Sequence, residues 1–323
     1  MSTPDIPLID ISVWRTGGDT RREILARQLD EAMRTSGFFL VRGHGIDPRL
    51  LADIRAEAKR FFALPAEVKQ EYRTPVGGRG WIANGDEANS FYGVASDPTK
   101  ADLKETLTFG REHATGNPEL DSEWFIPNVW PTQTPELKNL TARFTSQIFD
   151  LYLDLARILA VALGLPEDYF VRRVSDSPYT FNINRYPAMT ELDQPLDGQY
   201  RVGPHTDWGF LTILDRQPGY GGLQVQTLDG DWADAPFVPG ALTVNIADML
   251  ARWTGDRWRS TRHRVLPPPP EAPTEELISL IMFMEADMDQ RVSPFDPPIG
   301  GGVRYDPILA ADYFKQRAAA ATV

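Results

Sequence analysis

Residues 203–214 have the sequence GPHTDWGFLTIL, and the interpretation of the whole chain depends on this stretch. It places His205 and Asp207 two residues apart, directly before an apolar run. On an extended strand, residues i and i+2 point to the same face of the sheet. The His205 imidazole and the Asp207 carboxylate are therefore expected to converge on one point.

A third candidate ligand lies further along the chain. His263 occurs in the segment STRHRV, residues 260–265. Two histidines and one carboxylate, with coordination positions left open, form the facial triad of non-haem Fe(II) oxygenases. The alternative is that all three are ordinary polar residues of a half-buried sheet, which is the better interpretation of most isolated His-x-Asp pairs. The rest of the sequence has to decide between the two.

The composition narrows the kinds of site that this protein can hold. The 323 residues include no cysteine, which excludes disulfides, thiolate metal sites, iron–sulfur clusters and cysteine nucleophiles. A metal must therefore be bound by His, Asp or Glu. Of the two remaining histidines, we expect His44, on a turn between a strand and a helix, to be structural and His113 to lie at the surface. The net charge of −12 argues against nucleic acid or an anionic membrane as a partner.

The sequence favours a cytoplasmic protein. The N-terminal residues include Asp5 and lack an apolar core, so they do not resemble a signal peptide. The longest apolar stretch, Leu155–Leu165, is interrupted by Arg157 and is too short to span a bilayer. The oligomeric state stays open, with a monomer among the alternatives.

The two halves of the chain are predicted to have different secondary structure. The first half alternates strands and helices: strands are expected at Ile6–Ile11, Phe38–Val41 and Glu105–Gly110, and helices at about 20–35, 48–64 and 136–164. From about residue 176 the chain changes to short strands separated by Gly and Pro turns, which indicates a jelly roll or a β-sandwich. These strands are expected at Thr180–Tyr186, Gly209–Asp215, Leu223–Thr227, Trp232–Ala235, Ala241–Ile246 and Leu277–Met284.

Residues 75–100 are expected to form a loop with exposed aromatic side chains. The stretch contains four glycines between Gly77 and Gly85, together with Trp81, Phe91 and Tyr92. A flexible wall or lid over a substrate pocket uses such rings for apolar contact. A plain linker is an equally good interpretation of the glycines.

The order and spacing of several further segments carry a family resemblance. These segments are IPLID (6–10), SGFFLVRGHGI (36–46), FFALP (61–65), DLKE (102–105), NRYP (184–187), HTD (205–207), GLQV (222–225), VNIAD (244–248) and STRHRV (260–265). Together they resemble the isopenicillin N synthase-like group of Fe(II)- and 2-oxoglutarate-dependent oxygenases. That group also includes aminocyclopropane-carboxylate oxidase, anthocyanidin synthase and the gibberellin oxidases. The resemblance covers nearly the whole chain.

The resemblance implies an α+β fold. Its core is a double-stranded β-helix, a jelly roll of the cupin-like type, with flanking helices and a mixed α/β N-terminal region. The expected parts are the N-terminal region at 1–125, a scaffold helix at 126–175, the jelly-roll core at 176–290 and a C-terminal extension at 291–323.

The resemblance also implies the chemistry. His205, Asp207 and His263 are expected to hold a catalytic Fe(II), with 2-oxoglutarate and O2 as co-substrates. The expected reaction is the hydroxylation, desaturation or cyclisation of a small organic molecule in specialised or catabolic metabolism. Residues matching co-substrate positions of relatives are Asn184, Tyr186 and Ser279; those expected to contact substrate are Trp81, Phe91 and Tyr92.

One position departs from the family pattern. The family closes its co-substrate pocket with an Arg-x-Ser pair on a late strand, and Leu277 stands where the arginine is expected. Leucine cannot pair with the far carboxylate of 2-oxoglutarate. Arg185, Arg201 and Arg264 are alternative cations by their nearness in sequence to the site. Two other functions therefore stay open: an Fe(II) oxidase that works without 2-oxoglutarate, as isopenicillin N synthase does, and a non-catalytic jelly-roll binding module.

Overall fold

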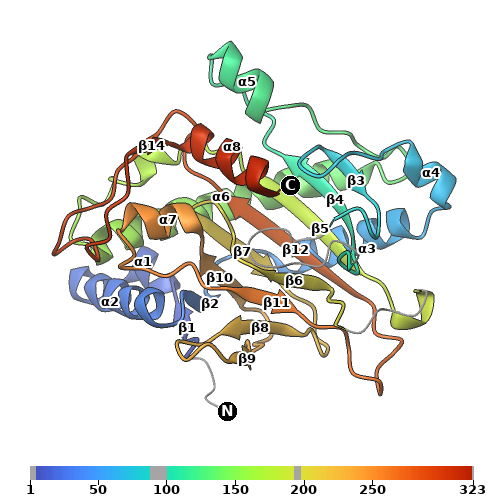
Figure 1. The fold of residues 1–323 in the computed structure, drawn as a ribbon, viewed down its shortest axis with the longest axis horizontal. Helices are drawn as coiled ribbons and strands as arrows, with labels where there is room; N and C mark the ends of the chain where they lie inside the picture. The colour runs from blue at the N-terminus through green and yellow to red at the C-terminus, as the bar shows by residue number, and fades with distance from the viewer. Residues whose placement is uncertain (1–4, 88–99, 193–197, 322–323) are drawn as a thin grey trace.

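Two facing β-sheets form the centre of the computed structural model, which describes residues 5–87, 100–192 and 198–321 (Figure 1). In these residues the large sheet has the strand order β1-β2-β10-β7-β12-β5-β4-β3, and the small sheet has the order β6-β11-β8-β9. The large-sheet strands are β1 (Leu8–Asp10), β2 (Phe38–Arg42), β3 (Gly80–Ile82), β4 (Glu105–Gly110), β5 (Thr180–Tyr186), β7 (Leu211–Asp215), β10 (Leu242–Ile246) and β12 (Leu277–Met284). The small-sheet strands are β6 (Val202–His205), β8 (Leu223–Gln226), β9 (Trp232–Asp234) and β11 (His263–Val265), and a separate pair joins β13 (Arg291–Val292) to β14 (Ile308–Leu309).

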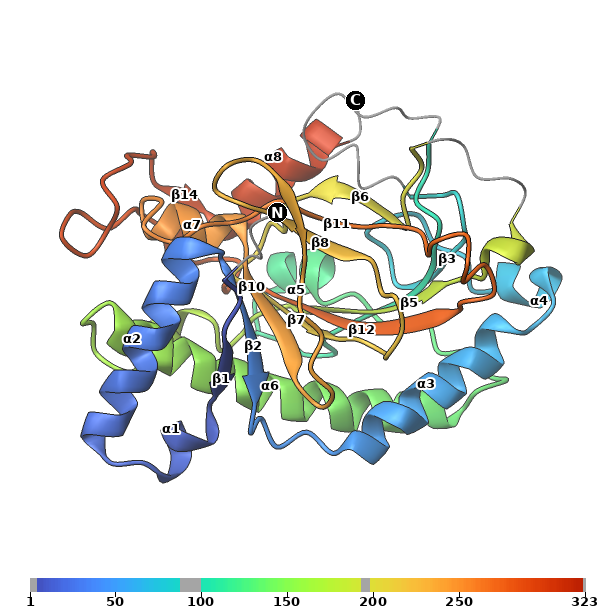
Figure 2. The ribbon, with the colours of Figure 1, turned by 90° about the horizontal axis from the view of Figure 1, so that it is seen from below.

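Helices surround the two sheets in the described residues. They are α1 (Ser12–Thr16), α2 (Asp19–Thr35), α3 (Pro48–Phe62), α4 (Ala66–Gln70), α5 (Pro118–Trp124), α6 (Glu136–Ala162), α7 (Asp248–Trp253) and α8 (Ala310–Ala321). The long helix α6 runs beneath the large sheet, between α2 and α3 (Figure 2). Within the described parts of the chain, every helix falls short of the combined length and apolar character that a membrane crossing requires.

The two central strands of the large sheet separate an apolar face from a polar one. On β5, Phe181 and Ile183 belong to the main hydrophobic core, whereas Asn182 and Asn184 line a cavity between the sheets. Strand β12 follows the same alternation, because Leu280 and its even-numbered neighbours join the core while Ile281 and Phe283 line the cavity. Successive side chains of a strand point to opposite faces, so one sequence supports α6 on one side and builds a site on the other.

Both halves of the chain build the large sheet. The N-terminal strands occupy its two edges, where β2 pairs with β10 and β4 pairs with β5. The small sheet packs over one end of this sheet through a second apolar cluster that joins Phe38 and Leu40 of β2 to Leu223 and Val225 of β8. The result is an α+β fold with a double-stranded β-helix at its centre.

The predicted helices and strands agree best with the structure where the sequence pattern extends over many residues. The bounds of β5 and β12 are as predicted, and α6 matches the expected helix at 136–164. Strands β6 and β11 were not predicted, because VGPH and HRV are short and partly polar. The loop expected at 75–100 is also wrong in part, since Trp81 lies in the buried strand β3 with 4% of its surface exposed. Phe91 and Tyr92 lie outside the described residues.

A leucine truncation tests the contribution of α6 to stability. Leu155 on α6 is fully buried, whereas Leu228 in the β8–β9 turn is 67% exposed. Leu155→Ala should lower the free energy of unfolding by about 2–5 kcal/mol, because it removes buried methyl groups and leaves a cavity. Leu228→Ala is the matched control and should change it by less than about 0.5 kcal/mol. Urea unfolding followed by circular dichroism measures both, and equal losses would contradict the packing assigned to α6.

Candidate metal centre and substrate cavity

Three side chains converge between the two sheets. His205 and His263 are direct cross-strand partners on β6 and β11, and Asp207 follows β6 two residues later. Asp207 Oδ1 lies 3.5 Å from His205 Nε2 and 3.8 Å from His263 Nε2. Both distances are below roughly 4.2 Å, twice a metal–ligand bond of about 2.1 Å. All three ligand atoms lie within 4.8 Å of one another, so the side chains form a group of candidate metal ligands.

Backbone carbonyls orient both imidazole rings. His205 Nδ1 lies 2.8 Å from the Gly203 carbonyl oxygen, and His263 Nδ1 lies 3.2 Å from that of Thr261. Each Nδ1 must carry a proton to donate to its carbonyl, so in the neutral ring each Nε2 keeps its lone pair. A hydrogen bond of this kind fixes both tautomer and ring orientation at metal sites. Both Nε2 atoms are thus prepared to bind a metal.

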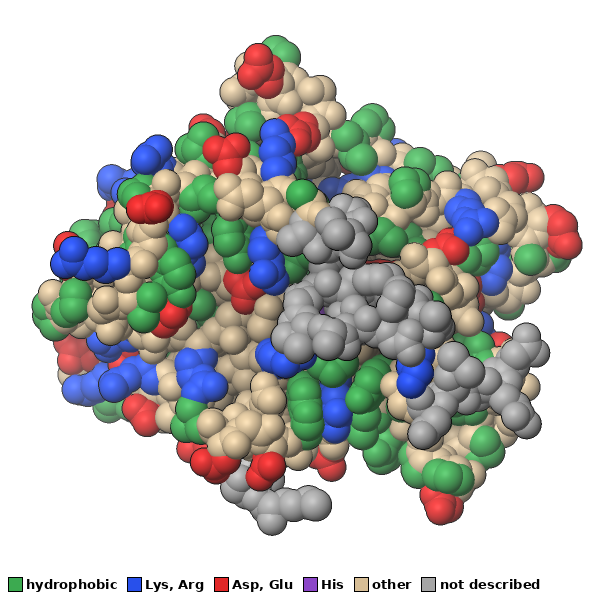
Figure 3. Space-filling model, in the orientation of Figure 1, with side chains coloured by type: hydrophobic (Ala, Val, Ile, Leu, Met, Phe, Trp, Pro, Cys, Tyr) green, Lys and Arg blue, Asp and Glu red, His purple; other side chains and the backbone are tan. Residues whose placement is uncertain are grey.

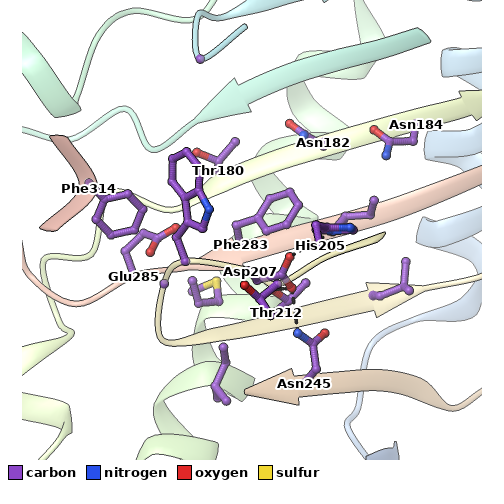
Figure 4. A pocket seen from close by; sticks show the side chains of 18 of the residues that line it. Thr180, Asn182, Asn184, His205, Asp207, Thr212, Asn245, Phe283, Glu285 and Phe314 are labelled. Atoms are coloured by element: carbon purple, nitrogen blue, oxygen red, sulfur yellow. Dashed lines mark hydrogen bonds and ion pairs between the residues drawn. The ribbon is translucent and has the colours of Figure 1, made fainter. Parts of the chain in front are cut away.

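The two oxygens of the Asp207 carboxylate also have separate partners. Its Oδ2 accepts hydrogen bonds from Thr212 Oγ1 at 2.5 Å and from Asn245 Nδ2 at 2.7 Å, which leaves Oδ1 toward the two histidines (Figure 4). His205 and Asp207 converge as predicted, but strand pleating does not explain the position of Asp207, because β6 ends at His205. Asp207 is instead placed by Thr212 on β7 and Asn245 on β10. A polar residue in an apolar strand is the signal that could have identified Asn245, since a buried amide needs a partner.

The protonation states suit metal binding. Burial, followed by the proximity of His205, lowers the pKa of His263 to about 4. Burial opposes a charge on Asp207, but its interactions with the two histidines outweigh burial and hold its pKa below the usual range. Burial also opposes the charged form of His205, whose pKa is raised above its usual value by the hydrogen bond and charge of Asp207. A metal binds the deprotonated forms, so Asp207 and His263 are already in the required state at pH 7.

A cavity of about 530 Å³ opens beside these ligands. Its volume is typical of a small-molecule site. Asn184 lies on one side of Asp207, whereas Thr180, Glu285 and Phe314 lie on the other (Figure 4). The strand register agrees, since β12 and β5 pair Ser279 with Asn184 at one end and Phe283 with Thr180 at the other. Helix α8 contributes to the wall through Phe314, a contact that sequence reasoning missed.

The predicted co-substrate residues lie together at one end of the cavity. Asn184 and Tyr186 line it, and Ser279 lies opposite Asn184 in the strand register. Burial raises the pKa of Tyr186, and hydrogen bonds with Asn184 and Ser279 partly offset the rise. Leu277, opposite Tyr186, packs in a small apolar cluster with Tyr186 and Val202.

The other end of the cavity carries polar groups with unmet hydrogen-bonding capacity. Among the described residues, Glu285 Oε2 and Asn182 Oδ1 are buried without a hydrogen-bond partner. Burial, followed by the charge of Asp207, raises the pKa of Glu285 to about 8. Arg79 lies at the same end, where its guanidinium donates to Thr180 Oγ1 at 3.3 Å. Sequence reasoning missed both Glu285 and Arg79, because neither lies in a recognisable motif.

The remaining predicted residues lie away from the metal ligands. Trp81 pairs in register with Leu107 of the main hydrophobic core, and its Nε1–H donates to Glu105 Oε2 at 2.8 Å. In the described ranges it is not part of the cavity wall. His44 hydrogen-bonds to the Gly240 carbonyl and accepts from Ile46 N–H, as expected for a structural residue. His113 is partly exposed and lies 3.2 Å from Asp176.

Two family models match the chain. Residues 6–133 match the N-terminal region of the non-haem dioxygenases in morphine synthesis, and residues 179–285 match the 2OG-Fe(II) oxygenase superfamily, in which 2OG is 2-oxoglutarate. The chain is 37% identical to the validamycin A dioxygenase of Streptomyces hygroscopicus subsp. limoneus over 304 residues, which cover 93% of this chain and 82% of the relative. It is 32% identical to a homoarginine-6-hydroxylase of Glycine max, with 90% of this chain and 88% of the relative covered.

Solved structures agree with these matches. A full-length Neurospora crassa protein, crystallised in complex with alpha-KG (2-oxoglutarate) and thymine, superposes with a TM-score of 0.83 at 29% identity, covering 98% of this chain and 96% of that one. A putative 2OG-Fe(II) oxygenase family protein of Caulobacter crescentus gives a TM-score of 0.84 at 27% identity, with 98% and 99% covered.

The chain belongs to the 2OG-Fe(II) oxygenase superfamily. It is an Fe(II)- and 2-oxoglutarate-dependent dioxygenase that acts on a small molecule. This result removes the two alternatives that the sequence left open, the oxidase that works without 2-oxoglutarate and the non-catalytic binding module.

The hydrogen bonds to Asp207 should control metal affinity. Asn245→Ala removes one of the two donors to Oδ2, so the carboxylate loses orientation and affinity for Fe(II) should fall about 10- to 100-fold. Asn117→Ala is a matched control, because the Asn117 side chain accepts from backbone N–H groups of α5 rather than bonding to a metal ligand. Anaerobic metal titration of both variants measures the effect. Unchanged affinity in Asn245→Ala would show that this hydrogen bond does not support the site.

Proposed function

We propose that His205, Asp207 and His263 hold the catalytic Fe(II). The observation that carries this proposal is that each ligand side chain uses one polar atom to bind the protein and leaves another free for a metal. The two Nδ1 atoms and Asp207 Oδ2 are engaged by the protein, while both Nε2 atoms and Oδ1 face one another. Three protein ligands leave three positions of an octahedral metal for other groups.

The protein's own contribution is to position and enclose the reactants. When bound, Fe(II) with 2-oxoglutarate and O2 supplies the oxidising power that acts on the substrate. Asn184, Tyr186 and Ser279 form the end of the cavity that seats the co-substrate, because they offer hydroxyl and amide groups to a carboxylate. The apolar wall of Leu211, Ile281 and Phe283 keeps water away from the reacting centre.

The opposite end of the cavity is the substrate end. Glu285 and Asn182 line the cavity and offer a carboxyl group and an amide to a ligand with donor groups, while Glu285 Oε2 and Asn182 Oδ1 are themselves enclosed by protein. The best match is a polar small molecule that carries an amine or another cationic group. Relatives named homoarginine-6-hydroxylases support this class, because homoarginine is cationic. The relative named for validamycin A leaves other polar substrates open.

Other predictions stand beside this proposal. They are the cytoplasmic location, the substrate contacts of Phe91 and Tyr92, and the division at 1–125, 126–175, 176–290 and 291–323; Trp81 lies outside the described cavity wall. On the face shown in Figure 3, acidic and basic side chains are interspersed rather than gathered by sign. This mixed surface supports a small molecule as the main partner.

Removal of one ligand tests the metal assignment. His263→Ala should lose most of the bound iron and nearly all succinate formation from 2-oxoglutarate while keeping its far-UV circular dichroism. His44→Ala is the matched control and should retain metal, because His44 makes only backbone hydrogen bonds in the described structure. Full iron content and full activity in His263→Ala would overturn the triad.

Substitution at the substrate end tests the substrate class. Succinate formation would be measured over a panel of amine-bearing small molecules, each with an uncharged analogue of the same size. The native protein should prefer the amine in the best pair, and Glu285→Gln should raise its KM at least tenfold while changing the KM of the uncharged analogue little. An equal effect on both members of the pair would argue against a cationic substrate.

A further inference from the structure

The co-substrate end of the cavity lacks the cation expected on β12. Leu277 is 7% exposed and packs against Tyr186 and Val202, so it offers the far carboxylate of 2-oxoglutarate only hydrocarbon. A carboxylate buried without a partner is strongly disfavoured. Since the protein uses 2-oxoglutarate, another group must receive this charge.

The three arginines suggested by the sequence already bind other residues, although Arg201 also lies over the Tyr186 ring. Arg185 pairs with Glu105, Glu191 and Glu276. Arg201 donates to both the carboxylate and the carbonyl of Glu275, at 2.9 Å each. Arg264 donates to Gln224 and lies over the Trp232 ring. None of the three is part of the cavity wall in the described residues.

Strand register identifies a different cation. Strands β4 and β5 pair Glu105 with Arg185, and Lys104, the residue just before β4, continues this antiparallel direction toward Tyr186, with which it interacts electrostatically. Strands β12 and β5 pair Leu277 with the same tyrosine. Lys104, Tyr186 and Leu277 therefore form one row across three strands, and members of such a row share a face. Lys104 and Tyr186 both line the cavity.

Lys104 is built to hold a carboxylate at this position. Its side chain is 3% exposed, and its Nζ lies 2.7 Å from Oε2 of Glu87, another residue of the cavity wall. Burial opposes the charge on Lys104, but Glu87 and Asp102 outweigh it and raise the pKa of its ammonium, which keeps it charged. The other cations of the described wall, Arg79 and Lys315, belong to the opposite end and to α8.

We propose that Lys104 receives the far carboxylate of 2-oxoglutarate, in place of the arginine that Leu277 replaces. This inference rests on the proposed function of the metal triad and of the co-substrate end. An ammonium group has three donors and can serve Glu87 and the co-substrate together, or exchange one for the other. Glu87 then weakens the binding of 2-oxoglutarate, because its carboxylate repels the far carboxylate of 2-oxoglutarate or competes with it for Lys104.

The test compares 2-oxoglutarate with 2-oxopentanoate, which has the same chain length but a methyl group in place of the far carboxylate. Anaerobic calorimetry on the Fe(II)-loaded protein gives both affinities without turnover. The native protein should prefer 2-oxoglutarate. Lys104→Met should reduce this preference at least tenfold by weakening 2-oxoglutarate alone, and Glu87→Gln should increase it.

Two further variants keep the test decisive. Lys104→Met combined with Glu87→Gln removes both charges, so its loss of preference does not reflect an orphaned buried carboxylate. Adding Leu277→Arg to Lys104→Met returns a cation to the same row and should recover the preference. Arg264→Met is the matched control and should leave it unchanged.

The outcomes distinguish a wrong role for Lys104 from a wrong location of the co-substrate end. If both keto acids bind but no Lys104 variant changes their ratio, Lys104 is not the carboxylate partner. If the iron is bound and neither keto acid binds the native protein, the proposed co-substrate end itself is wrong.

Discussion

The structure depends most directly on the burial of one charged carboxylate. Asp207 is almost fully enclosed, and a buried charge is tolerated only when hydrogen bonds and opposite charge surround it. Thr212 and Asn245 supply hydrogen bonds from the large sheet, and the two histidines approach from the small sheet. The same side chain thus ties the two layers together and orients the metal ligands. For this reason the candidate metal centre lies between the sheets rather than along one strand.

The cavity follows from the pleat of two strands. Because β5 and β12 present apolar residues to the main core, their other faces are held rigidly and can carry polar side chains. Neighbouring members of a cross-strand row lie about 5 Å apart, which is within reach of a long side chain. A charge lost at Leu277 can therefore be offset from a strand two places away, as the position of Lys104 suggests.

Sequence reasoning succeeded where a signal was local. The periodicity of α6 and the apolar runs of β5 and β12 extend over enough residues to define their bounds. The three candidate ligands were found because a chain with four histidines and no cysteine offers few alternatives. Trp81 was misplaced because its glycine-rich surroundings resemble a loop, although β3 completes the edge of the sheet. The short strands β6 and β11 carry too few residues to show any period.

The sequence by itself determined which donor atoms were present, the family to which their spacing is similar, and the absence of the expected arginine at position 277. Only the tertiary structure decided which atoms meet. It placed Asp207 by contacts with Thr212 and Asn245, opened Glu285 to the cavity and set Lys104 beside Tyr186. The position of Lys104 relative to Tyr186 and Leu277 depends on strand register between segments about 80 to 100 residues apart, and register is fixed by the packing of the whole sheet rather than by local sequence.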